Sequence, residues 1–187
     1  MIRARYHVNT LWKLTLVSAC AAMVVLWPNW RVALQSLGYY QEEGRMTGGG
    51  KCTATDLVTG EVVAVTHGFE LHCDINDLPN NLEINWKDAA GTEQRFHLEE
   101  LTSATCTDDP AIDQKPPSAP FDTFIGTGTG SFNGQPDYTI SFTFVDAGEP
   151  GTKDTARYLI TAPDGTTIVL DVSTKHLTFG NHQAHKN

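Results

Sequence analysis

The residues best suited to chemistry are histidines and a carboxylate in two separate parts of the chain. One group lies in the segment THGFELHCD (66–74), and the other lies in GNHQAHK (180–186) near the C-terminus. Imidazole and carboxylate groups are common ligands of Zn²⁺ and Cu²⁺. If the two segments meet in the fold, they form a candidate transition-metal site. Its ligands are His67, Glu70, His72, His182 and His185.

The backbone conformation decides which of these side chains converge. In an extended segment alternate residues share a face, so His67, Phe69, Leu71 and Cys73 form an apolar face opposite Gly68, Glu70 and His72. On a strand His182 and His185 face opposite ways, and on a helical turn they converge. In the alternative interpretation the outer face is merely solvated. Asn181, His182 and Gln183 then hydrogen-bond the backbone of a neighbouring loop.

A second group of potential ligands lies in DAGEPGTKD (146–154). Asp146, Glu149 and Asp154 gather hard oxygen atoms in one glycine-rich loop, which suits Ca²⁺. The loop does not follow the twelve-residue EF-hand pattern. In the alternative interpretation the Glu149–Gly151 tripeptide forms a turn, and the acids accept hydrogen bonds from backbone N–H groups.

Known catalytic and phosphate-binding motifs are absent from the sequence. It contains neither G-x-S-x-G nor HExxH, so no catalytic residue is assigned. The segment GGGK (48–51) is not a phosphate loop. The pattern G-x-x-x-x-G-K-[ST] requires Gly at position 45 and Ser or Thr at position 52, where this chain has Arg45 and Cys52. We therefore expect a non-enzymatic domain for binding, adhesion or surface assembly, for which a structural Ca²⁺ or Zn²⁺ is the candidate cofactor. The alternative is a metal-dependent hydrolase or oxidoreductase that uses the histidine and glutamate cluster.

Short apolar runs separated by turn residues must position these groups. In NLEINW (81–86), Leu82, Ile84 and Trp86 alternate with polar residues, as in a half-buried strand. The proline- and acid-rich stretch 103–120 reads as a surface loop. We expect an all-β fold, an antiparallel β-sandwich with jelly-roll or Ig-like topologies as alternatives. The expected strands lie within 61–74, 81–86, 94–101, 124–132, 138–145, 155–162, 166–172 and 175–180.

The N-terminus predicts export. A basic stretch ending at Lys13 precedes LTLVSACAAMVVLW (14–27), an apolar run that is shorter than the roughly 20 residues of a membrane-spanning helix. The expected organisation is a signal peptide or uncleaved N-terminal anchor helix (1–34), a linker (35–46) and a β-domain (47–187). The segment VSAC (17–20) also matches a lipoprotein cleavage box. We expect a secreted, periplasmic or cell-surface location, with membrane contact only through an uncleaved N-terminus.

Charge and cysteine content restrict the partners. The first 34 residues hold four of the 13 basic residues and none of the 22 acidic ones. The remainder therefore has a formal charge of −13, which argues against nucleic acid as a partner. A surface protein or a glycan is the expected partner. The exported part keeps Cys52, Cys73 and Cys106, an odd number, so one thiol stays free or pairs between chains.

Several motifs together resemble an uncharacterised β-rich domain of secreted and cell-surface bacterial proteins, which often stands beside anchoring or Ig-like modules. The resemblance covers roughly residues 47–186. It implies a secreted β-domain without known enzymatic activity and a Cys73–Cys106 disulfide, with Cys52 as a departure from the pattern. The motifs are TGGG (47–50), HGFELHCD (67–74), PNNLEINW (79–86), FHLEELTSATCTDDP (96–110), FDTFIGTGTGSFNG (121–134), DAGEPGTKD (146–154) and GNHQAHK (180–186).

Overall fold

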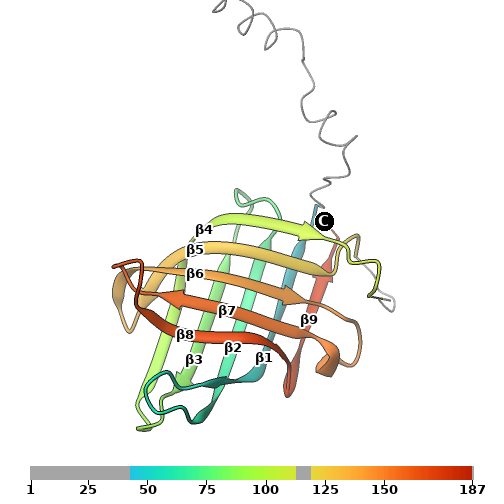
Figure 1. Cartoon of the computed structure of the whole chain (residues 1–187). Helices are drawn as coiled ribbons and strands as arrows, with labels where there is room; N and C mark the ends of the chain where they lie inside the picture. The colour runs from blue at the N-terminus through green and yellow to red at the C-terminus, as the bar shows by residue number, and fades with distance from the viewer. Residues whose placement is uncertain (1–42, 113–118, 187) are drawn as a thin grey trace, which may run out of the picture. The chain divides into compact units, whose positions relative to one another are not determined.

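The computed structural model describes residues 43–112 and 119–186 (Figure 1). The expected N-terminal hydrophobic helix lies outside these residues. Within them, no helix is long and apolar enough to cross a membrane. The elements are β1 Arg45–Thr55, β2 Val62–His72, β3 Asn81–Lys87, β4 Glu93–Thr107, β5 Thr123–Phe132, β6 Gln135–Val145, the 3-10 helix η1 Gly151–Lys153, β7 Thr155–Thr161, β8 Ile168–His176 and β9 Phe179–His185.

The strands form one antiparallel sheet in the order β8-β7-β6-β5-β4-β3-β2-β1-β9. Strands β1 to β8 follow one another as a meander, and the last strand returns to pair with the first. The all-β antiparallel class expected from the alternating patterns is confirmed. The sheet begins at Arg45, so Arg45 and Met46, which we expected in the linker, belong to β1.

The sheet curls over itself to form a half-barrel. Strand β4 pairs with β3 through Glu93–His97 and with β5 from Phe96 onward, and its register shifts between Leu98 and Ser103. Such irregularities bend a strand and let it pass from one layer to the next. In Figure 1, β5 to β8 cross in front of β9, β1, β2 and β3. One hydrogen-bonded sheet thus supplies both layers, whereas a sandwich was expected to pair two sheets.

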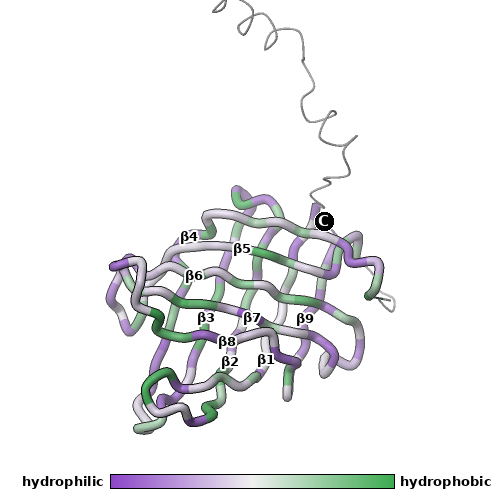
Figure 2. Tube along the Cα trace, viewed as in Figure 1, coloured by the Kyte–Doolittle hydropathy of each residue, from purple (hydrophilic) through white to green (hydrophobic). Residues whose placement is uncertain are grey.

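The core lies between these two layers. In β3 the inward Leu82, Ile84 and Trp86 are buried while Asn85 and Lys87 are exposed, so the alternation predicted for 81–86 is confirmed. Figure 2 shows apolar and polar positions interleaved along the strands. Burial of apolar side chains contributes about 25 cal/mol for each Å² removed from water. This burial holds the curled sheet closed.

The predicted loop 103–120 is wrong at its start, because β4 continues to Thr107. Ser103 and Thr105 pair with β5, and both residues are compatible with a strand. Their polar side chains face away from the core, which is why the stretch resembled a loop. Cys106 is buried near the end of β4 and forms a disulfide with Cys73, with 5.7 Å between their Cα atoms. The pairing implied by the resemblance is therefore confirmed.

Candidate functional site

Two histidines from distant parts of the chain meet inside the curled sheet. The Nε2 atoms of His67 on β2 and His182 on β9 lie 2.8 Å apart, within hydrogen-bond distance. We call these residues the histidine pair. Their side chains are 6% and 1% exposed, so the contact is shielded from water. Of the histidines in the 66–74 and C-terminal segments, the structure thus brings His67 and His182 together.

The two strands that carry the pair are not neighbours, since β1 lies between β2 and β9. The contact forms because β1 has glycines at the facing positions. Gly50 pairs with His67, and Gly48 pairs with His182. A Cβ atom on Gly48 would lie 2.9 Å from the Cα atom of His182 and 3.2 Å from its ring. The glycines of TGGG therefore leave the space in which two imidazoles meet across an intervening strand.

The surrounding acceptors fix the proton positions in the pair. The Nδ1 atom of His182 lies 3.1 Å from the carbonyl oxygen of Val145, which only accepts, so this nitrogen carries the proton. The Nε2 atom of His182 must then accept, and Nε2–H of His67 donates to it. This leaves Nδ1 of His67 unprotonated, buried and without a hydrogen-bond partner. The pair is therefore neutral and directional.

An aromatic cage holds the histidine pair. The ring of His67 stacks on Phe144 at 5.2 Å between centroids, and Phe69 stacks on Phe144 at 4.2 Å. Tyr158 approaches His67 edge-on, and its hydroxyl lies 3.3 Å from the thiol of the free Cys52. Burial, together with the proximity of His182, lowers the pKa of His67 to about 3. Burial likewise lowers the pKa of His182 to about 4. Both histidines are thus uncharged at neutral pH.

Two aspartates fix the strand that carries His182. The carboxylate of Asp154 accepts the backbone N–H of His182 at 2.7 Å, and that of Asp146 accepts the N–H of Ala184 at 2.8 Å. Their other oxygens accept the N–H groups of Ala147 and Gly148. We call Asp146 and Asp154 the carboxylate pair. Since β9 has only β1 as a paired neighbour, these oxygens occupy donors that an edge strand otherwise exposes.

The carboxylate pair comprises two of the three predicted calcium ligands. Its oxygens accept backbone N–H groups, as the alternative interpretation of the 146–154 loop proposed. The third ligand, Glu149, accepts a hydrogen bond from the side-chain amide of Asn181 at 2.9 Å. Burial raises the pKa of Asp154 to about 6, and the nearby Asp146 and Glu149 also raise it. The two N–H bonds act in the opposite direction.

The five predicted transition-metal ligands do not lie in one place. His72 lies 2.9 Å from the carbonyl oxygen of Pro79 through Nδ1, and His185 contacts Thr47 at 2.8 Å. Glu70 lies 3.9 Å from Arg45. On strand β9, His182 points inward while His185 is on the other face, as alternation requires. Among the described residues, no three His, Cys, Asp or Glu side chains are grouped closely enough to hold a metal ion.

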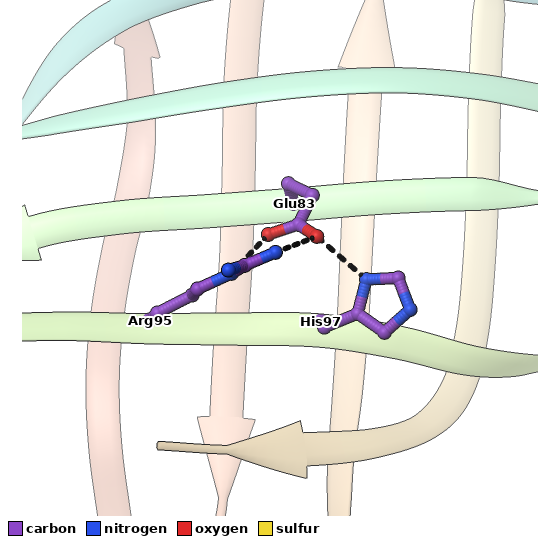
Figure 3. A network of polar contacts seen from close by, with 3 residues as sticks. All are labelled: Glu83, Arg95 and His97. Carbon is purple, nitrogen blue, oxygen red and sulfur yellow. Dashed lines mark hydrogen bonds and ion pairs between the residues drawn. The ribbon is translucent and has the colours of Figure 1, made fainter. Parts of the chain in front are cut away.

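The outer face of β3 and β4 carries a polar network that sequence reasoning missed. Glu83 accepts two hydrogen bonds from Arg95, at 2.7 and 2.6 Å, and its Oε1 atom lies 2.7 Å from Nδ1 of His97 (Figure 3). The Arg95 guanidinium, above all, holds the pKa of Glu83 below its usual range, with His97 adding to the effect. Alternation in 81–86 and 94–101 placed Glu83 and His97 each on the polar face of its strand, but only the register of β3 and β4 sets them opposite each other.

A cavity of about 490 Å³ opens beside this network on the same part of the sheet. Its walls come from β2, β3 and β4 and include hydroxyl, amide and charged groups. The lining residues are Ala64, Thr66, Asn85, Trp86, Lys87, Glu93, Gln94 and Arg95. Unlike the histidine pair, these polar groups are mostly exposed to solvent.

Comparison with known proteins found no matching family model, no matching curated protein and no matching solved structure.

Proposed function

We propose that this protein is a non-enzymatic binding domain of the secreted or cell-surface class. The observation that carries the proposal is that the histidines and carboxylates most capable of chemistry serve to hold the fold together. The histidine pair and the carboxylate pair are buried, and their polar atoms bond mainly to one another and to the backbone of β9 and its adjoining loop. Groups engaged in this way stabilise the fold and do not present themselves to a substrate.

Binding is supported by the open cavity on the outer face of β2 to β4. Ligand sites usually combine an apolar surface with a few well-placed polar groups. Here the lining combines the methyl group of Ala64 with hydroxyl, amide and guanidinium groups. The network of Glu83, Arg95 and His97 holds one of these side chains, the Arg95 guanidinium, in a defined position, which lowers the entropy lost when a ligand binds.

An extracytoplasmic location is supported by three features. The Cys73–Cys106 disulfide is typical of oxidising compartments. The N-terminal segment has the composition of an export signal, and the motifs resemble a domain of secreted bacterial proteins. An acidic β-domain displayed outside the cytoplasm is suited to binding a surface polymer or another surface protein.

The proposal is tested by measuring turnover and binding with the full-length protein. The turnover assay uses chromogenic esters and glycosides, with and without added Zn²⁺ or Ca²⁺. The binding assay measures co-sedimentation with an isolated insoluble bacterial envelope fraction. We expect co-sedimentation and no turnover. Turnover that disappears in His67→Gln or His182→Gln would overturn the proposal and favour the metal-dependent enzyme.

A further inference from the structure

Register places a continuous row of side chains across five strands on the outer face of the sheet. Each member pairs directly with the next, from β9 through β1, β2 and β3 to β4. Adjacent strands lie about 4.8 Å apart, so the row spans about 19 Å. It begins with an aromatic ring, continues through an ammonium, a hydroxyl and an amide, and ends with a guanidinium. The residues are Phe179, Lys51, Thr66, Asn85 and Arg95.

The adjacent row on the same face lacks side chains at its centre. Gly49 on β1 pairs with Gly68 on β2, and this row ends at Asn181 on β9 and at Glu83 and His97 on β3 and β4. We call Gly49 and Gly68 the glycine strip. It exposes bare backbone directly beside Lys51 and Thr66, which belong to the first row.

Gly68 has no packing reason to be glycine. A Cβ atom there would have only the carbonyl oxygen of Gly48 nearby, at 4.0 Å, an ordinary contact. Gly48 and Gly49 on β1 do have a packing reason. A Cβ atom on Gly49 would lie 2.9 Å from the carbonyl oxygen of His67, and one on Gly48 would lie too close to the backbone of β9. Glycine inside a strand destabilises it relative to alanine, and it often marks a place where a ligand approaches the backbone closely. The glycine at 68 therefore points to a ligand outside the fold.

The end of the row carries an exposed aromatic ring. The side chain of Phe179 is 77% exposed, an unusual position for a large apolar group. Phe179 pairs directly with Lys51 on β1, so the ring lies at the β9 end of the row. A flat ring at the edge of a polar surface is suited to stacking against the apolar face of a sugar ring, because the C–H groups of the sugar cover the ring while its hydroxyls point outward.

The charges of this face are largely compensated. Arg45 lies near Glu70, Lys87 near Glu93, and Arg95 near Glu83. The surface thus offers paired donors and acceptors with little net charge, on a domain whose formal charge beyond residue 34 is −13. Such a surface is complementary to a neutral ligand rich in hydroxyl groups and is unfavourable for a polyanion.

We propose that the outer face of β9, β1, β2, β3 and β4 binds a neutral polysaccharide chain. One sugar stacks on Phe179, and the chain crosses the glycine strip in contact with its backbone. Its hydroxyls bond to Thr66, Asn85 and Arg95, three of the residues that line the 490 Å³ cavity. This inference rests on the proposed binding function and names its ligand class.

The test is affinity electrophoresis of the full-length protein in native gels that contain hydroxyethylcellulose, galactomannan or the polyanion alginate. We expect at least one neutral polymer to retard the protein and alginate to leave it unretarded. Gly68→Thr covers the glycine strip, and Phe179→Ala removes the stacking surface. Each should weaken retardation at least tenfold. The matched control is Ser141→Thr, an exposed position on the outer face of β6, which should change nothing.

Stability measurements separate loss of the site from loss of the fold. Thermal melts should show Gly68→Thr at or above the melting temperature of the parent chain, because threonine suits a strand better than glycine. Should Gly68→Thr prove unstable, Phe179→Ala still tests the site, since that side chain is mostly exposed. Amide NMR shifts on adding the retarding polymer should centre on Gly49, Thr66 and Gly68.

Three outcomes would overturn this inference. They are the absence of retardation by any neutral polymer, retardation that the two substitutions leave unchanged, and self-association through Phe179 seen by analytical ultracentrifugation. If the protein still sediments with envelope fractions in these cases, the binding function stands and only the ligand class or the site is wrong. Histidine-dependent turnover would instead remove the binding function itself.

Discussion

Nε2 of His67 and Nε2 of His182 lie 2.8 Å apart, joining β2 to β9 over the glycines of β1. The hydrogen bond needs one of the two Nε2 atoms to be unprotonated, so it is lost when both imidazoles carry a charge. The pair therefore links the protonation of the core to the attachment of the last strand.

The first prediction concerns acid stability. The pKa values of His67 and His182 are lowered from 6.5 to about 3 and about 4. Their contribution to stability is complete above pH 6.5 and is lost as the pH falls toward these values, because the unfolded chain binds the protons first. Asp154, whose pKa is raised from 3.8 to about 6, acts oppositely, since its contribution is lost as the pH rises through that range. The two histidines together outweigh the single aspartate, so the free energy of unfolding should fall on acidification from pH 6.5 to 4.

Urea unfolding curves at several pH values check this expectation. In His67→Phe, which keeps an aromatic ring against Phe144, the slope of unfolding free energy against pH should decrease by about 1.4 kcal/mol per pH unit. The control is Ser141→Thr at an exposed position of β6, which leaves every titratable group in place and should keep the parent slope. A parent chain with no slope between pH 4 and 6.5 would contradict the neutral pair.

The second prediction concerns the carboxylate pair. Asp154→Ala leaves the N–H groups of His182 and Ala147 without their acceptor, so unfolding should become about 2–5 kcal/mol easier. Hydrogen exchange should show faster exchange of the His182 amide than in the parent chain. Asp171→Ala, at an exposed position of β8, should change stability by less than about 0.5 kcal/mol. Unchanged protection of the His182 amide would rule out this role for Asp154.

The third prediction compares two glycines with opposite environments. Gly48→Ala places a methyl group against the backbone of β9 and should destabilise the fold by about 1–3 kcal/mol. Gly68→Ala meets open space and should be neutral or stabilise by up to about 1 kcal/mol. In thermal melts, the melting temperature should therefore fall in Gly48→Ala and stay the same or rise in Gly68→Ala. Equal destabilisation would mean that Gly68 is required by the fold and would weaken the argument for a ligand.

The fourth prediction concerns the disulfide. Cys73 and Cys106 are 33 residues apart, and the chain-entropy estimate for closing a loop of this length is about 3–4 kcal/mol. Cys73→Ser and Cys106→Ser should lower stability by similar amounts, as should reduction of the parent chain. Cys52 is outside the disulfide, and burial raises the pKa of its thiol. It should therefore stay unmodified by iodoacetamide until the protein unfolds.

The fifth prediction concerns metal ions. Each oxygen of the carboxylate pair already accepts a backbone N–H, so a Ca²⁺ ion would compete with these donors for the carboxylates. Melting temperatures should be the same in EDTA, in Ca²⁺ and in Zn²⁺. A ligand present at 100 times its Kd would stabilise the fold by about 2.7 kcal/mol, which a thermal melt detects easily. Such a shift, together with stoichiometric metal by elemental analysis, would restore a predicted metal site.

The local pattern of the sequence was sufficient for much of the fold. The alternation of Leu82, Ile84 and Trp86 with polar residues determined a half-buried strand, because side chains of a strand point alternately to its two faces. The same rule placed His67 on the buried face of β2 and separated His182 from His185. At Ser103 and Thr105 the rule was insufficient, since their polarity suits both a loop and the outer face of a strand.

The sequence by itself determined the all-β antiparallel class and the inward and outward faces of strands such as 81–86. Only the tertiary structure decided that one curled sheet forms both layers, that β9 pairs with β1, and that the outer-face row from Phe179 to Arg95 is continuous. The physical reason is that pairing partners and bends depend on contacts between residues far apart in the chain. Alternation within a single strand carries no record of which strand lies next to it.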